Sequence, residues 1–480
     1  MEELDARTAD VLARRAAASL RRLGLSRGDR VAVVLPAPGD HADPAARLAA
    51  AAVQRDVLAL AYGALRVGIV PVMVNPALTP GERAPLIADS TPALVVNDPR
   101  ALRALLEGRD GEDDIPDIPL AKAMHFTSGT TGRSKGVWTG ILSESQAREM
   151  WADEIDPWDL NADDVLLTHG PLAHSAPLRF AIATLIAGGT VLLPGWFDAV
   201  AVARVLAERP PTVAFAVPSH LQRLFALSGG VPRSPYRLLV HAGAACPMPL
   251  KRQIHAWAGV DRVVEFYGAT EGQFSICPAV EWEERPGTVG RARRGRRLRI
   301  DEGVIWCAPP AWSGFSYWGD PEKTAAAWRA GPDGTDEFSV GDLGRLDDEG
   351  YLFLDGRRDD LIITGGVNVY PDDVESVLLA CPGVGQVAVF GVADEEWGQR
   401  VCAAIVGDAD EDAVRAWAAE HLAGYKRPKE YYRLDDLPRT ESGKVRRLGL
   451  PEALGLPSTP ARTSFPDHPP GIATEEGERR

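Results

Sequence analysis

The 480-residue sequence is poor in cysteine, has no long uninterrupted apolar run and carries fewer positive than negative side chains. Its five cysteines are widely spaced and odd in number, which favours neither a disulfide framework nor a zinc site and fits a reducing cytoplasm. The acidic start, MEELD, lacks the apolar core of a signal peptide. The longest apolar run, 180–193, contains two adjacent glycines and is too short for a membrane span. We therefore expect a soluble, cytoplasmic protein.

Positive charge is scarce overall, with one local exception. Fifty-two Lys and Arg residues against 67 Asp and Glu residues give a formal net charge of −15, which argues against general binding of nucleic acid. The run 291–299 (RARRGRRLR) is locally basic. It has two interpretations, a solvated strand and turn or a surface that attracts an anionic ligand, and the first is the commoner one. The chain is long enough to bury a large core in more than one domain.

Short apolar runs alternate with helical segments through the first two thirds of the chain. This alternation predicts largely parallel sheets covered by helices on both faces. Ligands collect at the carboxyl ends of strands in such folds, and the polar motifs of this chain follow apolar runs. The pattern predicts a helix at 57–67 and strands at 30–36, 70–74, 93–96, 165–167, 190–193, 213–215, 237–241 and 263–266.

A smaller α+β unit is predicted after the first 355 residues. We expect a domain at 1–355, a second domain at 356–450 and a disordered tail at 451–480, because the tail is rich in Pro, Thr, Ser and charge. The second domain should contain strands at 361–364, 386–392 and 400–406 and helices at 371–380 and 412–422.

The run 127–137 (TSGTTGRSKGV) combines hydroxyls, glycines and one lysine without apolar periodicity, so we expect a flexible loop. Glycine lets backbone N–H groups approach oxygen atoms, and lysine adds a mobile charge, so such a loop can wrap phosphates. It is not a Walker loop, because Ser134 stands where a second glycine is required. The alternative is a Ser/Gly-rich surface linker. The candidate phosphate-binding residues are Thr127, Ser128, Gly129, Thr130, Thr131, Gly132 and Lys135.

Three further polar blocks follow along the chain: FYGATE at 266–271, GDLGR at 341–345 with DGR at 355–357, and PRTESGK at 438–444. Together with the loop, these blocks resemble the ordered motifs of the adenylate-forming superfamily, which includes the acyl-CoA synthetases. The resemblance covers residues 4–447 in the family's order. Four motifs in sequence are hard to produce by accident.

The chain departs from the family pattern in two places. Ser134 replaces a proline of the phosphate loop, which should loosen one turn. The chain also begins at a point that the family normally reaches only after several tens of residues. Either the true start lies upstream, or this is a trimmed member.

The resemblance implies an ATP-dependent acid–CoA ligase. Such an enzyme activates a fatty or aromatic carboxylic acid as acyl-AMP with release of pyrophosphate, and then transfers the acyl group to CoA, with ATP, Mg²⁺ and CoA as cofactors. It implies an α/β fold with a large N-terminal domain of mixed, mainly parallel sheets flanked by helices. The smaller α+β C-terminal domain would be mobile, with its hinge near Asp359. The anionic ligand considered above would then be CoA.

Four residues would carry the chemistry by resemblance. Lys444 would bridge the substrate carboxylate and the α-phosphate, and Thr270 would donate to that phosphate. Glu271 would hold Mg²⁺, a hard cation that prefers carboxylate oxygen and bridges phosphates. His174 would flank the acyl pocket and gate access of the thiol.

The remaining candidates would bind the nucleotide and CoA. Tyr267 would offer its ring to the adenine, while Asp342 and Arg357 would contact the ribose. Each has an ordinary structural alternative: a core aromatic for Tyr267, a turn residue for Asp342, a surface lysine for Lys444 and a structural imidazole for His174. By resemblance, Gly243, Ala244, Ala245, Gly268 and Ala269 would line the adenine, and Gly365 and Gly366 would admit pantetheine.

Three functions stay open at this point. The leading one is the acid–CoA ligase. The second keeps the ATP chemistry and loads a carrier protein in secondary metabolism, or uses nitrite to diazotise an aromatic amine. The third is a non-enzymatic nucleotide-binding protein. The sequence does not decide which acid is used, and a homodimer is only a base-rate expectation.

Overall fold

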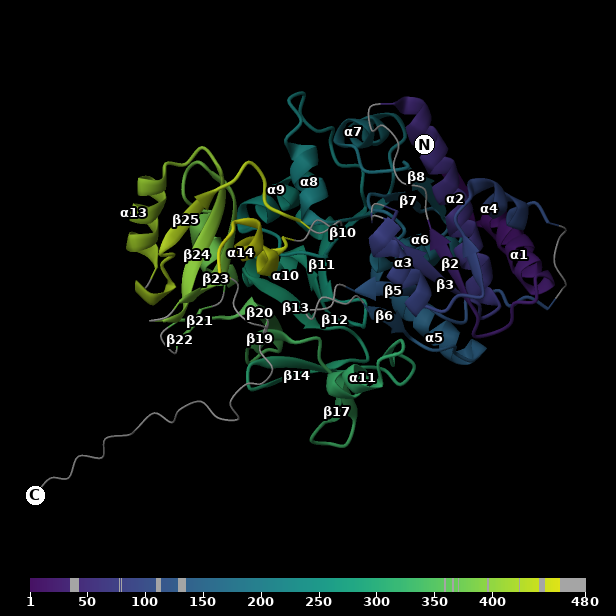
Figure 1. Ribbon diagram of the computed structural model, residues 1–480. Coiled ribbons are helices and arrows are strands. Elements are labelled where there is room, and N and C mark those ends of the chain that lie inside the picture. The colour runs from purple at the N-terminus through teal and green to yellow at the C-terminus, as the bar shows by residue number, and fades with distance from the viewer. Residues whose placement is uncertain are drawn as a thin grey trace, which may run out of the picture. The chain divides into compact units, whose positions relative to one another are not determined.

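Figure 1 shows a computed structural model of the chain. It divides into two compact units, one made of residues 1–359 with Arg439 and Val445, and the other made of residues 360–438 and 446–457. The structure describes residues 1–34, 43–76, 78, 80–108, 114–127, 135–357, 360–364, 367–369, 371–394, 397–422, 424–439 and 445–457.

The first unit contains a six-stranded sheet in the order β16-β6-β5-β3-β2-β4. The strands β4, β2, β3 and β5 are parallel, and β6 and β16 are antiparallel additions at one edge. Their bounds are Arg30–Val34 (β2), Val70–Val74 (β3), Leu94–Val96 (β4), Met124–Thr127 (β5), Lys135–Trp138 (β6) and Ser316–Tyr317 (β16).

A larger, mixed sheet completes this unit, in the order β1-β8-β7-β9-β10-β11-β12-β13-β20-β19-β15-β18-β17 with β14 paired to β15. It is parallel from β8 to β11 and antiparallel beyond. The bounds are Glu2–Asp5 (β1), Val165–Thr168 (β7), Thr190–Leu193 (β8), Val213–Ala216 (β9), Leu238–His241 (β10), Val263–Gly268 (β11), Gln273–Pro278 (β12), Thr288–Ala292 (β13), Arg297–Asp301 (β14), Val304–Ala308 (β15), Trp328–Ala330 (β17), Asp336–Phe338 (β18), Asp342–Leu346 (β19) and Tyr351–Arg357 (β20).

Helices cover both faces of the parallel part, which explains its continuous apolar runs. Side chains alternate along each strand, so Leu166 belongs to one apolar cluster and Leu167 to another. One cluster packs against α1, α2 and α6, and the other against α7, α8 and α9. The helices of this unit are Ala6–Arg22 (α1), Pro44–Arg66 (α2), Pro80–Asp89 (α3), Pro99–Leu106 (α4), Glu144–Ile155 (α5), Ser175–Ile186 (α6), Ala199–Glu208 (α7), Pro218–Phe225 (α8), Met248–Ala258 (α9), Ala279–Glu284 (α10) and Pro321–Ala327 (α11).

The helix α2 is longer than the predicted helix at 57–67. It begins at Pro44, and the Asp43 side chain caps it by accepting from the backbone N–H of Ala45. Among the described residues, Ala45–Arg66 is the helix that is long and apolar enough to cross a membrane, but 67% of its most apolar window is buried inside the fold. Figure 1 shows it among α1 and α4, as expected for a core helix.

The second unit is a five-stranded sheet, β22-β21-β24-β23 with β25 paired to β24, and packed helices. Arg447 ties its chain end to the rest of the unit through ion pairs with Asp360, Asp372 and Glu375. The bounds are Ile362–Thr364 (β21), Val367–Val369 (β22), Pro371–Leu378 (α12), Val384–Asp394 (β23), Gly398–Gly407 (β24), Glu411–His421 (α13), Glu430–Arg433 (β25) and Leu450–Ala453 (α14).

The predicted α/β class is confirmed, but two local expectations are corrected in part. Thr127 ends β5, and the stretch 135–137 lies in β6, so both ends of the predicted phosphate loop are strands. Thr127 and Lys135 are cross-strand partners in an antiparallel hairpin. The basic run is not simply solvated either, because Arg293 and Arg296 are buried and pair with Asp153.

Two glycines with positive φ differ in the space around them, so their substitution distinguishes backbone strain from steric overlap. Gly290 (φ 86°) lies in β13 so close to β12 that a Cβ would overlap the carbonyl oxygen of Ile276, whereas Gly303 (φ 78°) has open space around it. We predict that Gly303→Ala lowers the free energy of unfolding by about 1 kcal/mol. Gly290→Ala should lower it by about 2 kcal/mol more. Urea unfolding of both variants measures the difference, and equal losses would contradict the packing of β13 on β12.

Candidate active site

Two predicted nucleotide-binding side chains meet directly. The hydroxyl of Tyr267, near the end of β11, donates to Oδ2 of Asp342 at 2.5 Å. Asp342 is buried at the start of β19, and the β19–β20 register places the backbone of Arg357 opposite it. The antiparallel pairing therefore gathers the candidates for adenine and ribose contact, although they are widely separated in sequence.

A tight turn carries the predicted phosphate and metal contacts. It joins β11 to β12 and is closed by a hydrogen bond from the backbone N–H of Ala269 to the carbonyl of Gly272, at 2.7 Å. Gly272 has no room for a side chain, because a Cβ would lie 2.5 Å from Cζ of Phe338. The turn therefore holds Thr270 and Glu271 between the two strands. Glu271 directly precedes Gly272, which is the tightly packed end of the turn.

The Glu271 carboxylate is buried and lies beside the hairpin of β5 and β6, which we call the phosphate hairpin. Its Oε1 accepts a hydrogen bond from the hydroxyl of Tyr317 at 2.9 Å, and Nζ of Lys135 lies 5.1 Å from the centre of the same tyrosine ring. Burial and the neighbouring Lys323 together lower the pKa of Lys135 to about 8, against the opposing effect of Asp320 and Glu271. Glu271 and Lys135 are thus brought together as predicted.

Tyr317 and Lys323 were not among the predicted site residues. Tyr317 reaches the site because β16 pairs with β6 and places Tyr317 opposite Val137. The first turn of α11 is fixed on this strand, since the backbone N–H of Tyr317 donates to Oγ1 of Thr324 at 2.9 Å. The available signal was the Asp320-Pro pair, a helix start directly after an aromatic strand.

His174 occupies the N-cap position of α6. The preceding residue, Ala173, accepts a hydrogen bond from Nδ1 of His125 in β5 at 2.9 Å. This contact seats the turn before α6 on the strand that ends at Thr127. The structure therefore places His174 next to the nucleotide motifs.

The small-residue segment after β10 combines a buried and an exposed part. His241 is fully buried, with Nδ1 3.7 Å from Oε1 of Glu265. Gly243, Ala244 and Ala245 are exposed, and a Cβ on Gly243 would lie 3.4 Å from the Val217 side chain. The segment is therefore solvent-accessible after Ala242, and Gly243 packs against Val217, which follows β9.

Several predicted residues lie outside the described part of the chain, and their roles stay predictions. They are Ser128, Gly129, Thr130, Thr131 and Gly132 of the phosphate run, Lys444, the hinge residue Asp359, and Gly365 and Gly366. The side chain of Arg357 is also outside it.

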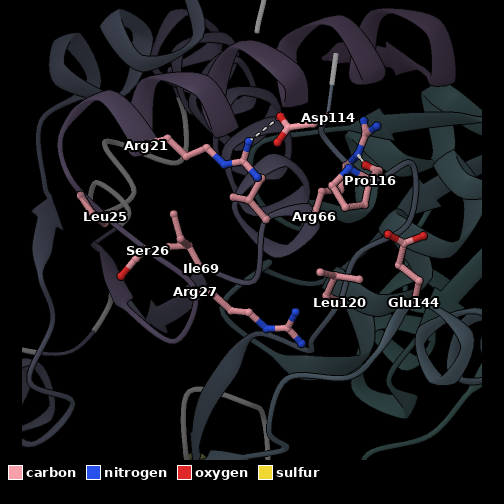
Figure 2. A pocket seen from close by; sticks show the side chains of 11 residues that line it. Arg21, Leu25, Ser26, Arg27, Arg66, Ile69, Asp114, Pro116, Leu120 and Glu144 are labelled. Carbon is pink, nitrogen blue, oxygen red and sulfur yellow. Dashed lines mark hydrogen bonds and ion pairs between the residues drawn. The ribbon is translucent and has the colours of Figure 1, made fainter. Parts of the chain in front are cut away.

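A cavity of about 420 Å³ lies elsewhere in the first unit (Figure 2). Arg21 and Asp114 form an ion pair at its wall with a 2.9 Å separation, and Arg27 and Arg66 also line it. Arg66 donates to the carbonyl of Pro116 and to Asp10. Because none of the predicted site residues lines this cavity, it is not the nucleotide site.

The sequence matches the family model of the AMP-binding enzymes over residues 51–304 and that of their C-terminal domain over residues 373–444. The chain belongs to the AMP-binding enzyme family. The predicted membership of the adenylate-forming superfamily is therefore confirmed, and with it an AMP-forming ligase that uses ATP and CoA.

Relatives and solved structures of this family span nearly the whole chain. An indoleacetate–CoA ligase of Aromatoleum aromaticum is 31% identical over 82% of this chain and 85% of its own length. A long-chain-fatty-acid–CoA ligase of Mycobacterium tuberculosis is 30% identical over 92% of both chains. The crystal structure of ATP-bound MatB from Rhodopseudomonas palustris is 31% identical, covers 93% of both chains and has a TM-score of 0.76. The predicted acid–CoA ligase activity is confirmed at this level.

Buried histidines near the site make the fold sensitive to acid. Burial lowers the pKa of His125, His169 and His241 from 6.5 to about 4 in each case. Between pH 6.5 and 4 the unfolded chain therefore binds protons that the native fold does not. We predict that the free energy of unfolding falls with decreasing pH in this window, by up to about 1.4 kcal/mol per pH unit for each histidine.

Urea unfolding at pH 7, 6 and 5 measures this slope. His169→Phe removes one titrating ring and should reduce this slope by up to about 1.4 kcal/mol per pH unit, which corresponds to one proton. This change in slope is expected whatever the substitution does to the stability at pH 7. An unchanged slope would show that His169 does not stay neutral in the fold.

Proposed function

We propose that this ligase adenylates a carboxylic acid at the turn between β11 and β12. The observation that carries the proposal is the position of this turn: Tyr267, at one end, contacts Asp342, and Glu271, at the other end, lies with Lys135 and Tyr317. An adenosine held at the first pair would direct its phosphates toward the second group. One rigid turn thereby aligns both ends of ATP.

The reaction brings two anions together, the acid carboxylate and the α-phosphate. Positive charge and alignment are therefore the main demands on the enzyme. Lys135 supplies charge from the phosphate hairpin, and Thr270 would donate to the α-phosphate from the turn. We assign the charge nearest the reacting carboxylate to Lys444, on the basis of its motif.

Glu271 would hold Mg²⁺. Among the described residues no three His, Cys, Asp or Glu side chains form a metal cluster, which fits a cation held by one carboxylate, waters and substrate phosphates. The Tyr317 hydroxyl, by donating to Oε1, holds the Glu271 carboxylate in place. When bound, the ion would neutralise charge on the phosphates.

Two further parts of the proposal follow from the motifs. The domains would be 1–355 and 356–450, with a tail at 451–480 whose first residues complete α14. Rotation near Asp359 would carry Lys444 to the nucleotide and, after adenylation, Gly365 and Gly366 to pantetheine. The acid would lie between His174, Val217 and Gly243; a Cβ on Gly243 would lie 3.4 Å from Val217, and the turn that carries His174 is seated on β5 through Ala173. The relatives' acids, indoleacetate and long-chain fatty acids, support a carboxylic acid without fixing its size.

We further place the enzyme in the cytoplasm and in secondary metabolism, acting as a homodimer with CoA as acceptor. Five free thiols support a reducing compartment. A solved relative at 25% identity and a TM-score of 0.76 is an amide bond synthetase from Marinactinospora thermotolerans. A carrier protein or an amine is therefore the alternative acceptor to test beside CoA.

Exchange of labelled pyrophosphate into ATP tests the adenylation step. With a panel of aryl and alkyl acids, we expect exchange with the wild-type enzyme and a loss of at least about 100-fold in Lys444→Ala, because a charge aimed at the reacting phosphate is removed. Lys429→Ala, at an exposed lysine of the second unit, is the matched control and should retain exchange.

Mass analysis of reactions with CoA, a carrier protein or an amine identifies the acceptor. Absence of exchange in the wild type with every acid, or near-normal exchange in Lys444→Ala, would contradict the proposal.

A further inference from the structure

A single buried carboxylate collects side chains from three separate segments. Glu154, in α5, is 3% exposed. It accepts hydrogen bonds from Nζ of Lys122 at 3.1 Å, from Nη1 of Arg179 at 2.7 and 2.9 Å, and from Nε2 of Gln273 at 3.0 Å to each oxygen. None of these four residues belongs to the predicted motifs.

Each of the three donors stands close to a motif along the chain. Lys122 precedes β5, which ends at Thr127. Arg179 lies in α6, the helix that begins directly after His174. Its Nε donates to Oγ of Ser175 at 3.2 Å. Gln273 is the first residue of β12, two residues after Glu271. Glu154 is therefore connected at once to β5, to the start of α6 after His174, and to the turn between β11 and β12.

Buried positive charge surrounds this carboxylate. Burial raises the pKa of Glu154, but Arg179 and Lys122 outweigh it and hold the pKa well below its usual value. The adjacent Asp153 pairs with Arg296 at 2.8 Å and with Arg293 at 3.5 Å. Such networks cost desolvation, and apolar side chains of the same volume can stabilise a fold as well or better. The geometry that the network imposes, rather than its energy, is its distinctive contribution.

We propose that Glu154 is a positioning residue for adenylation, which sets the distances between the phosphate strand, the His174 turn and the Glu271 turn. The inference rests on the proposed function, because it concerns the alignment of the same site. Glu154 acts through Lys122, Arg179 and Gln273 rather than on a substrate. Small errors in the placement of reacting groups cost large factors in rate, so loss of one tether should lower the turnover.

Gln273→Met tests one tether without changing charge. It removes both hydrogen bonds to Glu154 and leaves the ion pairs with Arg179 and Lys122. We expect kcat for pyrophosphate exchange to fall at least about 10-fold at a temperature far below the melting transition, because the Glu271 turn is no longer aligned. Glu154→Gln should fall further, and the double variant should lose less than the product of the two factors, since both act through one contact.

The matched control is Asp164→Asn. Asp164 is a buried carboxylate at the amino end of β7, away from the motifs, and it accepts from Arg237 and from Oγ1 of Thr212 at 2.7 Å. We expect this variant to lower the melting temperature while kcat stays within about twofold of the wild type, because it loses a buried ion pair far from the reacting groups.

The outcomes separate the possibilities. If Gln273→Met melts earlier than the wild type but keeps its kcat and its KM for ATP, Glu154 has only a structural role and the inference is wrong. If Glu154→Gln does not fold, Gln273→Met alone decides. Hydrogen exchange gives a readout without turnover: amides of 273–278 should lose protection in Gln273→Met, and those of 175–180 should not. A wild type that never exchanges pyrophosphate would overturn the proposed function, while unaltered protection of 273–278 would overturn the tether.

Discussion

The turn between β11 and β12 is the constraint on which the rest of the first unit depends. It is short because β11 and β12 are antiparallel neighbours, and it is rigid because Gly272 lies against the Phe338 ring. Here the large sheet changes from parallel to antiparallel pairing. The parallel half contributes strand ends around His241, and the antiparallel half contributes Asp342. The proposed nucleotide site lies near the carboxyl ends of β10 and β11, where open α/β sheets generally bind their ligands.

Electrostatics within the site follow from what each carboxylate contacts. Glu271 accepts a hydrogen bond from the neutral hydroxyl of Tyr317, with Lys135 over the same ring, and in the proposed site it would also bind a metal ion. Glu154, in contrast, is enclosed by Lys122, Arg179 and an amide, so its charge is consumed within the protein. The two buried glutamates therefore have contrasting surroundings, although Gln273, which donates to Glu154, is only two residues after Glu271. Their contrast arises from neighbours and not from depth, since both are almost completely buried.

Local patterns predicted much of the fold, and distant contacts explain what they missed. The strands at 70–74 and 190–193 were predicted with their observed bounds, because apolar β-branched runs are bounded by turn residues. The start of α2 was missed because its signal is a single capping pair. Tyr317 was missed because only the pairing of β16 with β6 brings it to Glu271. The burial of Arg293 was equally hidden, since its partner Asp153 is far away in the sequence. Pairings of this kind leave no local periodicity.

The pairing of the first strand has a consequence for how the chain is made. β1 (Glu2–Asp5) forms its hydrogen bonds with β8 (Thr190–Leu193), and α2 contacts both β1 and β8 as well as α6. During synthesis, β1 and α2 cannot form these contacts until nearly two hundred residues have left the ribosome. A long apolar helix emerges early and remains without much of its native covering through that interval. We therefore expect folding of this unit to be slow, because its contacts join segments that are far apart in the sequence.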